Sequence, residues 1–377
     1  MNTGRYTKST LLALITVLIA FSVPDRTLQA GAEDDSRRMW TNIYDEAVWD
    51  LRFGTAREKV NAARMFGAHQ KTEYIRPLSD ELLRDLESET FRHLPANDPY
   101  VKATIAWALG EIGHKHVVPQ LLKALEITDR LITAEIDAVK AARAEYEQSV
   151  AGGGNANPNA EEGDDFRIDP VFIEPTRPGP FIRGGFRFAY SPDMWWTLSD
   201  EFKSAAGILD DDGAQQIRLE NANYMNLARA IFGALAKIGD DRAVEPLQAY
   251  LAPEKIPHLR VYAAHALGQI GSDSGVQAVK AAYDSEADEL VKIQFCLAIL
   301  KNNKADFDYY YKLTEFLASD DRRIRLDAAR AFEVLSMGES EPTLREALRI
   351  ESDPLIRGVL EKAIHNAVID YITPVNY

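Results

Sequence analysis

The sequence has almost no cysteine: Cys296 is the only one in 377 residues. An intramolecular disulfide is therefore excluded, and the fold must be stabilised by the burial of apolar surface. When the repeated segments of the chain, described below, are aligned with one another, Cys296 falls at the same position as Ala106, Ala264 and Ala329. All four residues at this position are small. A cysteine in such a position is typical of a buried core residue. We expect Cys296 to pack in the core rather than to act as a nucleophile.

The motifs of common enzyme classes are also missing. None of the seven histidines is followed by glutamate, so the paired His-Glu motifs of di-iron hydroxylases are absent. His114 and His116 share one turn, but no cysteine or carboxylate cluster completes a metal set around them. Asp210–Gly213 is similar to a calcium loop, but Ile208 and Leu219 occupy the first and last ligand positions. We predict no catalytic residue, no metal and no cofactor.

Positive charge is scarce, because 43 Lys and Arg face 58 Asp and Glu and leave a net charge of −15. Such a surface is a poor match for nucleic acid or for an anionic membrane. We therefore expect no nucleic-acid partner. A solvated surface, a basic protein partner and divalent cations are all compatible with this charge, and the oligomeric state is left open.

Long hydrophobic runs are limited to one, Leu11–Val23, which follows Arg5 and Lys8. The run is shorter than the ~20 residues that a membrane span needs, and small residues around Ala30 offer a cleavage site. We expect residues 1–30 to be a signal peptide. The mature protein would then be periplasmic or extracellular, with no stable membrane insertion. The alternative is an uncleaved membrane anchor.

The sequence is rich in one helical unit, which is clearest at Leu259–Gly271. Pro257 suits the first turn of this helix, where a missing N–H costs nothing. Gly271 suits the left-handed residue that ends a helix. The apolar side chains that fall on one face of the helix are Leu259, Ala263, Ala266, Leu267 and Ile270.

Copies of this unit recur along the chain, and from Ala236 to His365 their spacings are 32, 32, 33 and 32 residues. The column of large apolar residues that should form the core is Phe66, Leu109, Leu235, Leu267, Ile299, Phe332 and Ile364. Gly113, Gly239 and Gly271 occupy the cap column, and Asn303 takes that place in a fourth copy. About seven copies of a helical hairpin predict an all-α fold, an α-solenoid.

Helix starts repeat as well. The acidic residues in the N-cap column are Asp98, Asp288, Asp321 and Asp353. The basic residues that follow four positions later are Lys102, Lys292, Arg325 and Arg357. We expect each acid to pair with its base across one helical turn, for about 0.2–0.5 kcal/mol. Repetition would turn these pairs into a ladder between stacked helices.

Three segments carry a family resemblance. A-L-G-E-I-G (Ala108–Gly113), A-L-G-Q-I-G (Ala266–Gly271) and D-D-R-A-V-E-P-L (Asp240–Leu247) resemble HEAT repeats of the phycobilisome-lyase-like class. The resemblance covers most of residues 50–150 and 220–370. It implies a scaffold or binding platform, the main role in this family. The enzymatic role of some relatives, chromophore attachment, belongs in a cytoplasm, and the export signal argues against it. A DNA-repair role would need a basic groove, which this acidic chain lacks.

The repeats stop between roughly residues 151 and 215, which separates repeats in 31–150 from repeats in 216–377. Three glycines at 152–154 and several prolines disfavour long helices in this segment. The alternative is three decayed repeats, because Gly110 and Ala236 are 126 residues apart, close to four periods. Between residues 166 and 202 stand nine of the chain's 35 aromatic residues, and Phe181–Tyr190 predicts a β-hairpin around a two-glycine turn.

This insertion supplies the candidate binding site. The side chains that we expect to contact a partner are Arg183, Phe186, Arg187, Phe188, Tyr190, Trp195 and Trp196. Trp, Tyr and Arg dominate interface hot spots. Alternatively, the aromatic residues pack onto the solenoid and seal the break in the array.

The sequence therefore predicts a non-enzymatic exported scaffold that binds a protein partner through the solenoid face and the insertion. The alternative is a ligand-binding protein or lyase-like enzyme with a site between the insertion and the solenoid.

Overall fold

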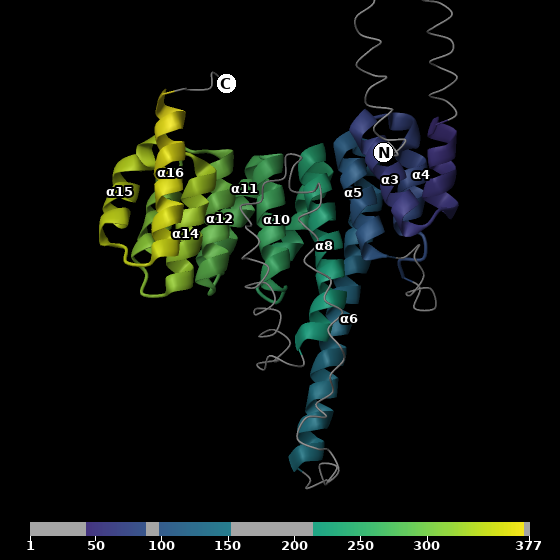
Figure 1. Ribbon diagram of the computed structural model, residues 1–377, viewed down its shortest axis with the longest axis horizontal. Coiled ribbons are helices and arrows are strands. Elements are labelled where there is room, and N and C mark those ends of the chain that lie inside the picture. Colours follow the sequence, from purple (N-terminus) through teal and green to yellow (C-terminus); the bar gives the residue numbers. More distant parts are fainter. Residues whose placement is uncertain (1–42, 88–97, 152–213, 373–377) are drawn as a thin grey trace, which may run out of the picture.

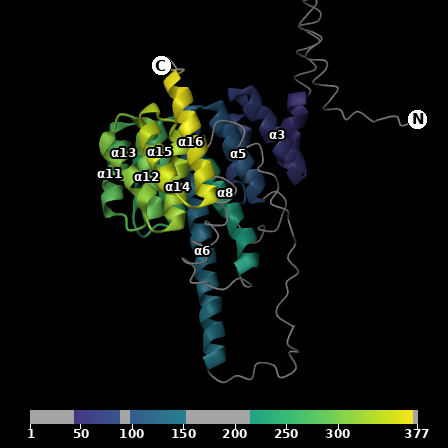
Figure 2. The ribbon, with the colours of Figure 1, turned by 60° about the vertical axis from the view of Figure 1, so that its left-hand side comes forward.

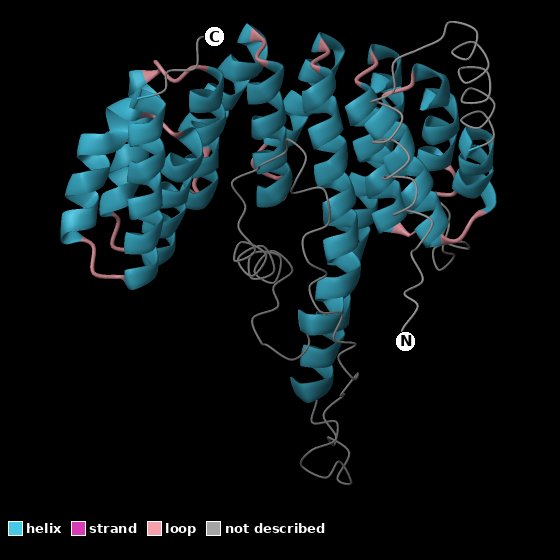
Figure 3. Ribbon diagram, turned by 45° about the horizontal axis from the view of Figure 1, so that its top comes forward, coloured by secondary structure: helices cyan, strands magenta, loops and turns pink. Residues whose placement is uncertain are grey.

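The computed structural model describes residues 43–87, 98–151 and 214–372, and in these ranges it contains helices and short connections but no strand (Figure 3). A first helix spans residues 43–53. The helices that begin each hairpin are α3 (Ala56–His69), α5 (Pro99–Ile112), α8 (Ala214–Ile238), α10 (Pro257–Ile270), α12 (Glu289–Asn302), α14 (Arg322–Leu335) and α16 (Pro354–Ile372). The helices that follow them are α4 (Ile75–Leu83), α6 (Val118–Ala151), α9 (Val244–Gln248), α11 (Asp273–Ser285), α13 (Phe307–Glu315) and α15 (Glu341–Ile350).

The helices that begin the hairpins form one row, which we call the first row. Each contacts the next, from α3 and α5 through α8, α10 and α12 to α14 and α16. Figure 1 shows this row running across the molecule, with α3 near one end and α16 at the other. The helices that follow them form the second row. The predicted α-solenoid is confirmed, with seven first-row helices in the described residues.

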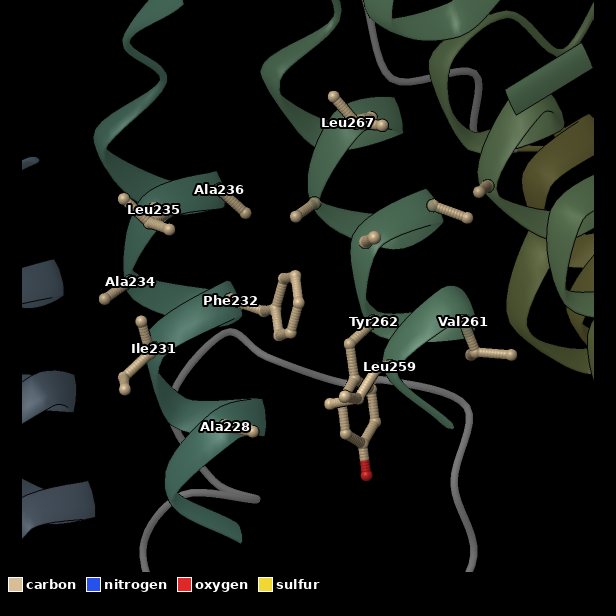
Figure 4. Packing of buried hydrophobic residues seen from close by; sticks show 14 of the residues in the cluster. Ala228, Ile231, Phe232, Ala234, Leu235, Ala236, Leu259, Val261, Tyr262 and Leu267 are labelled. Atoms are coloured by element: carbon tan, nitrogen blue, oxygen red, sulfur yellow. The ribbon is translucent and has the colours of Figure 1, made fainter. Parts of the chain in front are cut away.

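The core lies between neighbouring first-row helices. Every residue of the predicted apolar column is buried, from Phe66 at 0% exposed to Ile364 at 8%. In Figure 4, Phe232 of α8 and Tyr262 of α10 point toward each other, and their ring centroids are 6.0 Å apart. Because each repeat buries its apolar face only against its neighbours, the array is stabilised by stacking.

Small residues let the first-row helices approach closely. A Cβ added to Gly67 would lie 2.9 Å from Ala108 Cα, and one added to Gly110 would lie 2.8 Å from Ala234 Cα. At Gly268 the added Cβ would lie 2.6 Å from the carbonyl oxygen of a residue in α12. Real Cβ atoms do not come this close to other heavy atoms. These three glycines therefore set the distance between the first-row helices that meet at them.

The predicted glycine caps are confirmed, because Gly113, Gly239 and Gly271 have φ of 70°, 63° and 74°. The prediction for Asn303 is wrong: its backbone is extended, with φ −140°. Its side-chain Oδ1 accepts a hydrogen bond from Ala305 N at 3.1 Å, which turns the chain without a left-handed residue. The sequence reading missed two left-handed caps, at Gln70 and Ser336.

The N-cap aspartates are confirmed, but their expected pairs with the base four residues later are not. Asp321 Oδ1 accepts from Arg323 N at 2.7 Å. Arg325 of α14 instead donates to Glu351 Oε2, just after the second helix of its own hairpin, at 2.8 Å, and to Ser319 O, at the end of the preceding hairpin, at 2.9 Å. The long basic side chain reaches back to free carbonyls at the end of the preceding helix, where a cation is favoured. A ladder exists, but it joins neighbouring helices, within one hairpin and between successive hairpins, rather than turns of one helix.

The two sides of the insertion are adjacent in space. α5 packs directly against α8, so the row contains no further repeat between them. This arrangement contradicts the alternative of three decayed repeats, which would have separated these helices.

Two expectations fall outside the described residues: the signal peptide at residues 1–30 and the β-hairpin at Phe181–Tyr190. Both stay predictions. Within the described ranges, every helix is too short or too polar to cross a bilayer.

Candidate functional site

The predicted partner-binding residues, Arg183 to Trp196, also lie outside the described residues. The structure describes the two helices that lead into and out of the insertion. α6 ends at Ala151 and α8 begins at Ala214. The geometry of these helices shows how the insertion is joined to the solenoid.

Both flanking helices are unusually long. α6 has 34 residues and α8 has 25, whereas α5, α10, α12 and α14 have 14 each. At 1.5 Å per residue, α6 is about 50 Å long. Figures 1 and 2 show the C-terminal part of α6 leaving the solenoid, with the first turns of α8 beside it. We call residues 133–151 and 214–223 the arm.

The sequence explains why α6 continues so far. After Pro119, in the first turn, it has no proline or glycine up to Ala151, and six of its last 18 residues are alanine, the best helix former. Three consecutive glycines follow immediately. The last buried side chain before the arm is Ile132, which is 0% exposed. The helix is thus anchored at its base and continues on its own propensity.

Polar contacts join the hairpins on the two sides of the insertion. Lys237 forms an ion pair with Glu111. Arg242 Nη2 donates to the carbonyl oxygen of Lys115 at 2.6 Å, and Lys255 Nζ lies 2.6 Å from Asp129 Oδ2. Each contact joins residues 126 or 127 apart, yet each bridges neighbouring hairpins.

Asp240 organises the turn after α8. Its Oδ1 accepts from the backbone and side-chain nitrogens of Arg242 at 3.0 Å, and its Oδ2 lies 2.8 Å from Arg242 Nη2. The side-chain bond from Arg242, followed by the backbone bond, lowers the pKa of Asp240 to about 2. The pair therefore stays ionised at neutral pH and holds Arg242 in reach of Lys115.

Buried charges between α3 and α5 cap helix ends. Lys59 Nζ donates to Leu51 O at 2.7 Å and lies 2.6 Å from Glu81 Oε1, and both charged side chains are almost fully buried. Lys102 Nζ donates to the carbonyl oxygens of Glu81 and Arg84, at 2.8 Å for the latter. Burial lowers the pKa of Lys102 to about 8. These lysines satisfy free carbonyls, and a structural role accounts for both.

The buried histidines of α10 are neutral. His265 Nε2 lies 3.1 Å from Gln294 Oε1 of α12. Burial lowers the pKa of His258 and of His265 to about 3. Neither side chain is more than 5% exposed, so neither reaches a solvent-facing substrate.

Cys296 is 0% exposed, and burial raises the pKa of its thiol to about 12. A thiol that stays protonated and buried is a poor nucleophile. The expectation that Cys296 is a core residue is confirmed.

His114 and His116 contact each other, with ring centroids 4.7 Å apart. His114 Nδ1 accepts from His116 N at 3.3 Å. No group of three metal-ligating side chains occurs in the part of the chain that the structure describes.

Exposed aromatic residues outside the insertion form two pairs. Trp49 and Phe53 are 61% and 62% exposed, with ring centroids 5.5 Å apart. Phe307 and Tyr311 of α13 are 53% and 61% exposed. The four-residue spacing in each pair places both rings on one side of a helix.

The fold and the arm define a class of protein: an α-solenoid of stacked hairpins in which two neighbouring helices, α6 and α8, extend outward. Comparison with known families is more specific. A family model described as HEAT repeats matches residues 214–299, from α8 into α12. A second, described as PBS lyase HEAT-like repeat, matches residues 101–126 in α5 and α6. The two matches support a HEAT-repeat protein of the phycobilisome-lyase-like class. A search of curated proteins found no match.

Proposed function

We propose that this protein is an exported, non-enzymatic scaffold that binds a protein partner through its solenoid face and the insertion at residues 152–213. The observation that carries the proposal is the arm, because it attaches this segment to helices that project from the array (Figure 2). Insertions in repeat proteins form loops on one face, often the binding face.

The composition of the insertion indicates the kind of partner. Residues 152–213 contain 12 acidic and five basic side chains, so this segment alone contributes −7 to a net charge of −15. Its nine aromatic residues offer large contact areas at a low entropic cost. A basic protein surface with apolar pockets matches both properties.

The described titratable groups support a scaffold rather than an enzyme. Lys59 and Lys102 cap helix ends, His265 contacts Gln294 between two helices, and Cys296 is buried in its protonated form. The fold itself is typical of scaffolds that present extended surfaces.

The family description favours one alternative, an enzyme or ligand-binding protein with a site between the insertion and the solenoid. Mass spectrometry of the intact protein under native conditions tests this alternative. A bound small molecule that is lost when residues 152–213 are removed would favour it.

The main test replaces residues 152–213 with a short Gly/Ser linker between α6 and α8. We expect an unchanged melting temperature and loss of partner capture from the cell envelope, because the arm is joined to the solenoid through its base. The matched control changes exposed aromatic residues elsewhere, Phe307→Ala with Tyr311→Ala, and should retain capture.

A large fall in melting temperature after this deletion would assign the insertion a structural role. Retained melting together with retained capture would exclude both roles.

A further inference from the structure

The described array begins with half a hairpin. Helix 43–53 stands where a second-row helix stands in other repeats, because the next first-row helix caps its end. Lys59 Nζ donates to Leu51 O at 2.7 Å. Arg357 Nη1 of α16 donates to Leu348 O of α15 at 2.7 Å in the same manner. No first-row helix precedes helix 43–53 in the described residues.

The described array ends with a first-row helix that has no second-row helix after it. α16 is a first-row helix that packs on α14 and α15, and no second-row helix follows it in the described range. No further first-row helix follows it either, so the face of α16 that corresponds to the α12-facing side of α10 is open in the described range. Its exposed residues Leu355, Glu361, Lys362 and His365 stand at positions whose counterparts in α10 are all buried, namely His258, Ala264, His265 and Gly268. A Cβ added to Gly358 would meet nothing within 4 Å.

The charges at the two ends are complementary. In three hairpins, α3–α4, α10–α11 and α14–α15, the capping base of the first helix pairs with an acid near the end of the second. Arg260 Nε lies 2.7 Å from Glu286 Oε2, and Lys59 Nζ lies 2.6 Å from Glu81 Oε1. Arg357 has bonds to carbonyls, but no acid pairs with it in the described residues.

The missing acid has a counterpart at the other end of the array. Asp50 stands in the last turn of helix 43–53, and no base pairs with it within the described part of the chain. Burial raises its pKa, and so do the neighbouring charges of Glu58 and Glu46. Each end of the described array therefore holds one unmatched half of the ion pair that three hairpins complete.

Exposed apolar side chains mark the same two ends. Trp49 and Phe53 lie on helix 43–53, and Leu355 and Ile369 of α16 are 45% and 46% exposed. Four of the eight exposed large apolar residues in the described ranges thus lie on the two terminal helices.

We propose that the chain associates head to tail, with helix 43–53 of one copy packing beside α16 of another and supplying the second helix of its last repeat. A second copy of the chain fits both ends of the array. Its second-row helix 43–53 meets the first-row helix α16, and its Asp50 meets Arg357. Such a contact is heterologous, so it continues the array rather than closing a two-fold dimer. The partner here is the chain itself, and the proposal is independent of the insertion.

The first experiment measures sedimentation velocity of the purified protein over a wide concentration range. We expect the weight-average sedimentation coefficient to rise with concentration. Trp49→Ala with Phe53→Ala should weaken association about tenfold or more, because interface aromatic residues carry much of the binding energy. Phe307→Ala with Tyr311→Ala is the matched control and should not change it.

The second experiment identifies the geometry. A variant blocked at one end, Trp49→Ala with Phe53→Ala, is mixed with a variant blocked at the other, Leu355→Glu with Ile369→Glu. Each alone should be monomeric, and the mixture should form one-to-one dimers. Circular dichroism of each variant checks that its fold is retained.

The third experiment exchanges the charges. Asp50→Arg should weaken association, and adding Arg357→Asp in the same chain should restore it.

A sedimentation coefficient that does not change with concentration would overturn the proposal. That result is expected if residues 31–42 of the same chain cover helix 43–53. Association that survives the Trp49 and Phe53 changes would also overturn it. Blocked variants that do not pair when mixed would show that the contact is not head to tail.

Discussion

Gly268 and Gly358 allow one packing argument to be tested with two identical substitutions. Both residues lie inside first-row helices, α10 and α16, where alanine is favoured over glycine by about 0.8–1.0 kcal/mol. Their surroundings differ. A Cβ at Gly268 would lie 2.6 Å from Ala298 O and 3.1 Å from its carbonyl carbon, whereas a Cβ at Gly358 would lie in open space.

The clash at Gly268 involves backbone, so no rotamer change relieves it and α10 must move away from α12. Overpacking of this kind costs about 1–3 kcal/mol, and a backbone clash belongs at the upper end. After the gain in helix propensity, we expect Gly268→Ala to lower the free energy of unfolding by about 2 kcal/mol. Gly358→Ala should raise it by up to about 1 kcal/mol.

Urea denaturation followed by circular dichroism, at a protein concentration low enough to avoid self-association, measures both changes. Hydrogen exchange should show faster opening of α10 and α12 in the Gly268 variant alone. If Gly268→Ala raised the urea midpoint as Gly358→Ala does, the close approach of these helices would be refuted.

Three further predictions concern the cap, the histidines and export. Gly271→Val should destabilise the protein more than Gly239→Val, because both positions are left-handed but only a Cβ at Gly271 would meet Asn302 Nδ2, at 2.9 Å; urea midpoints compare them. Because burial holds the pKa of His258 and of His265 near 3, below the value of about 6.5 in the unfolded chain, the unfolded state binds protons first as pH falls. Stability should therefore decrease between pH 6.5 and 3, by up to about 1.4 kcal/mol per unit for each histidine, and His265→Gln should flatten this dependence in urea titrations. Residues 1–32 should export a reporter that is active only outside the cytoplasm, and an intact Met1 on the soluble protein would contradict cleavage.

The repeat pattern was sufficient to predict the core and the glycine caps. Leu267 and its counterparts are buried because each copy places one apolar face against the next. Gly271 is left-handed because a helix that ends there needs a residue without Cβ strain. Local sequence determines both features, so both can be predicted from one sequence alone.

Other features depend on contacts that the pattern does not specify. Asn303 has an alternative to the left-handed state, a bond from its own side chain to Ala305 N, and the column alignment did not reveal it. Arg325 pairs with Glu351, 26 residues later, rather than with Asp321, because its side chain is long enough to reach the end of the second helix of its hairpin. The binding role of Phe186, Trp195 and their neighbours stays a prediction, because they lie outside the described residues.

The joint between α5 and α8 has a consequence for how the chain folds. Contacts such as that of Lys237 with Glu111 bring together residues that are 126 positions apart in the sequence. Equivalent residues of most successive repeats are only about 32 positions apart. Each doubling of a closed loop costs about 0.6 kcal/mol of chain entropy, so this fourfold longer closure costs about 1.2 kcal/mol more. Nucleation should therefore occur separately in α3–α6 and in α8–α16, with docking of the two halves as the late and slow step. The place where Gly110 meets Ala234 is then the point at which the array first separates when it unfolds.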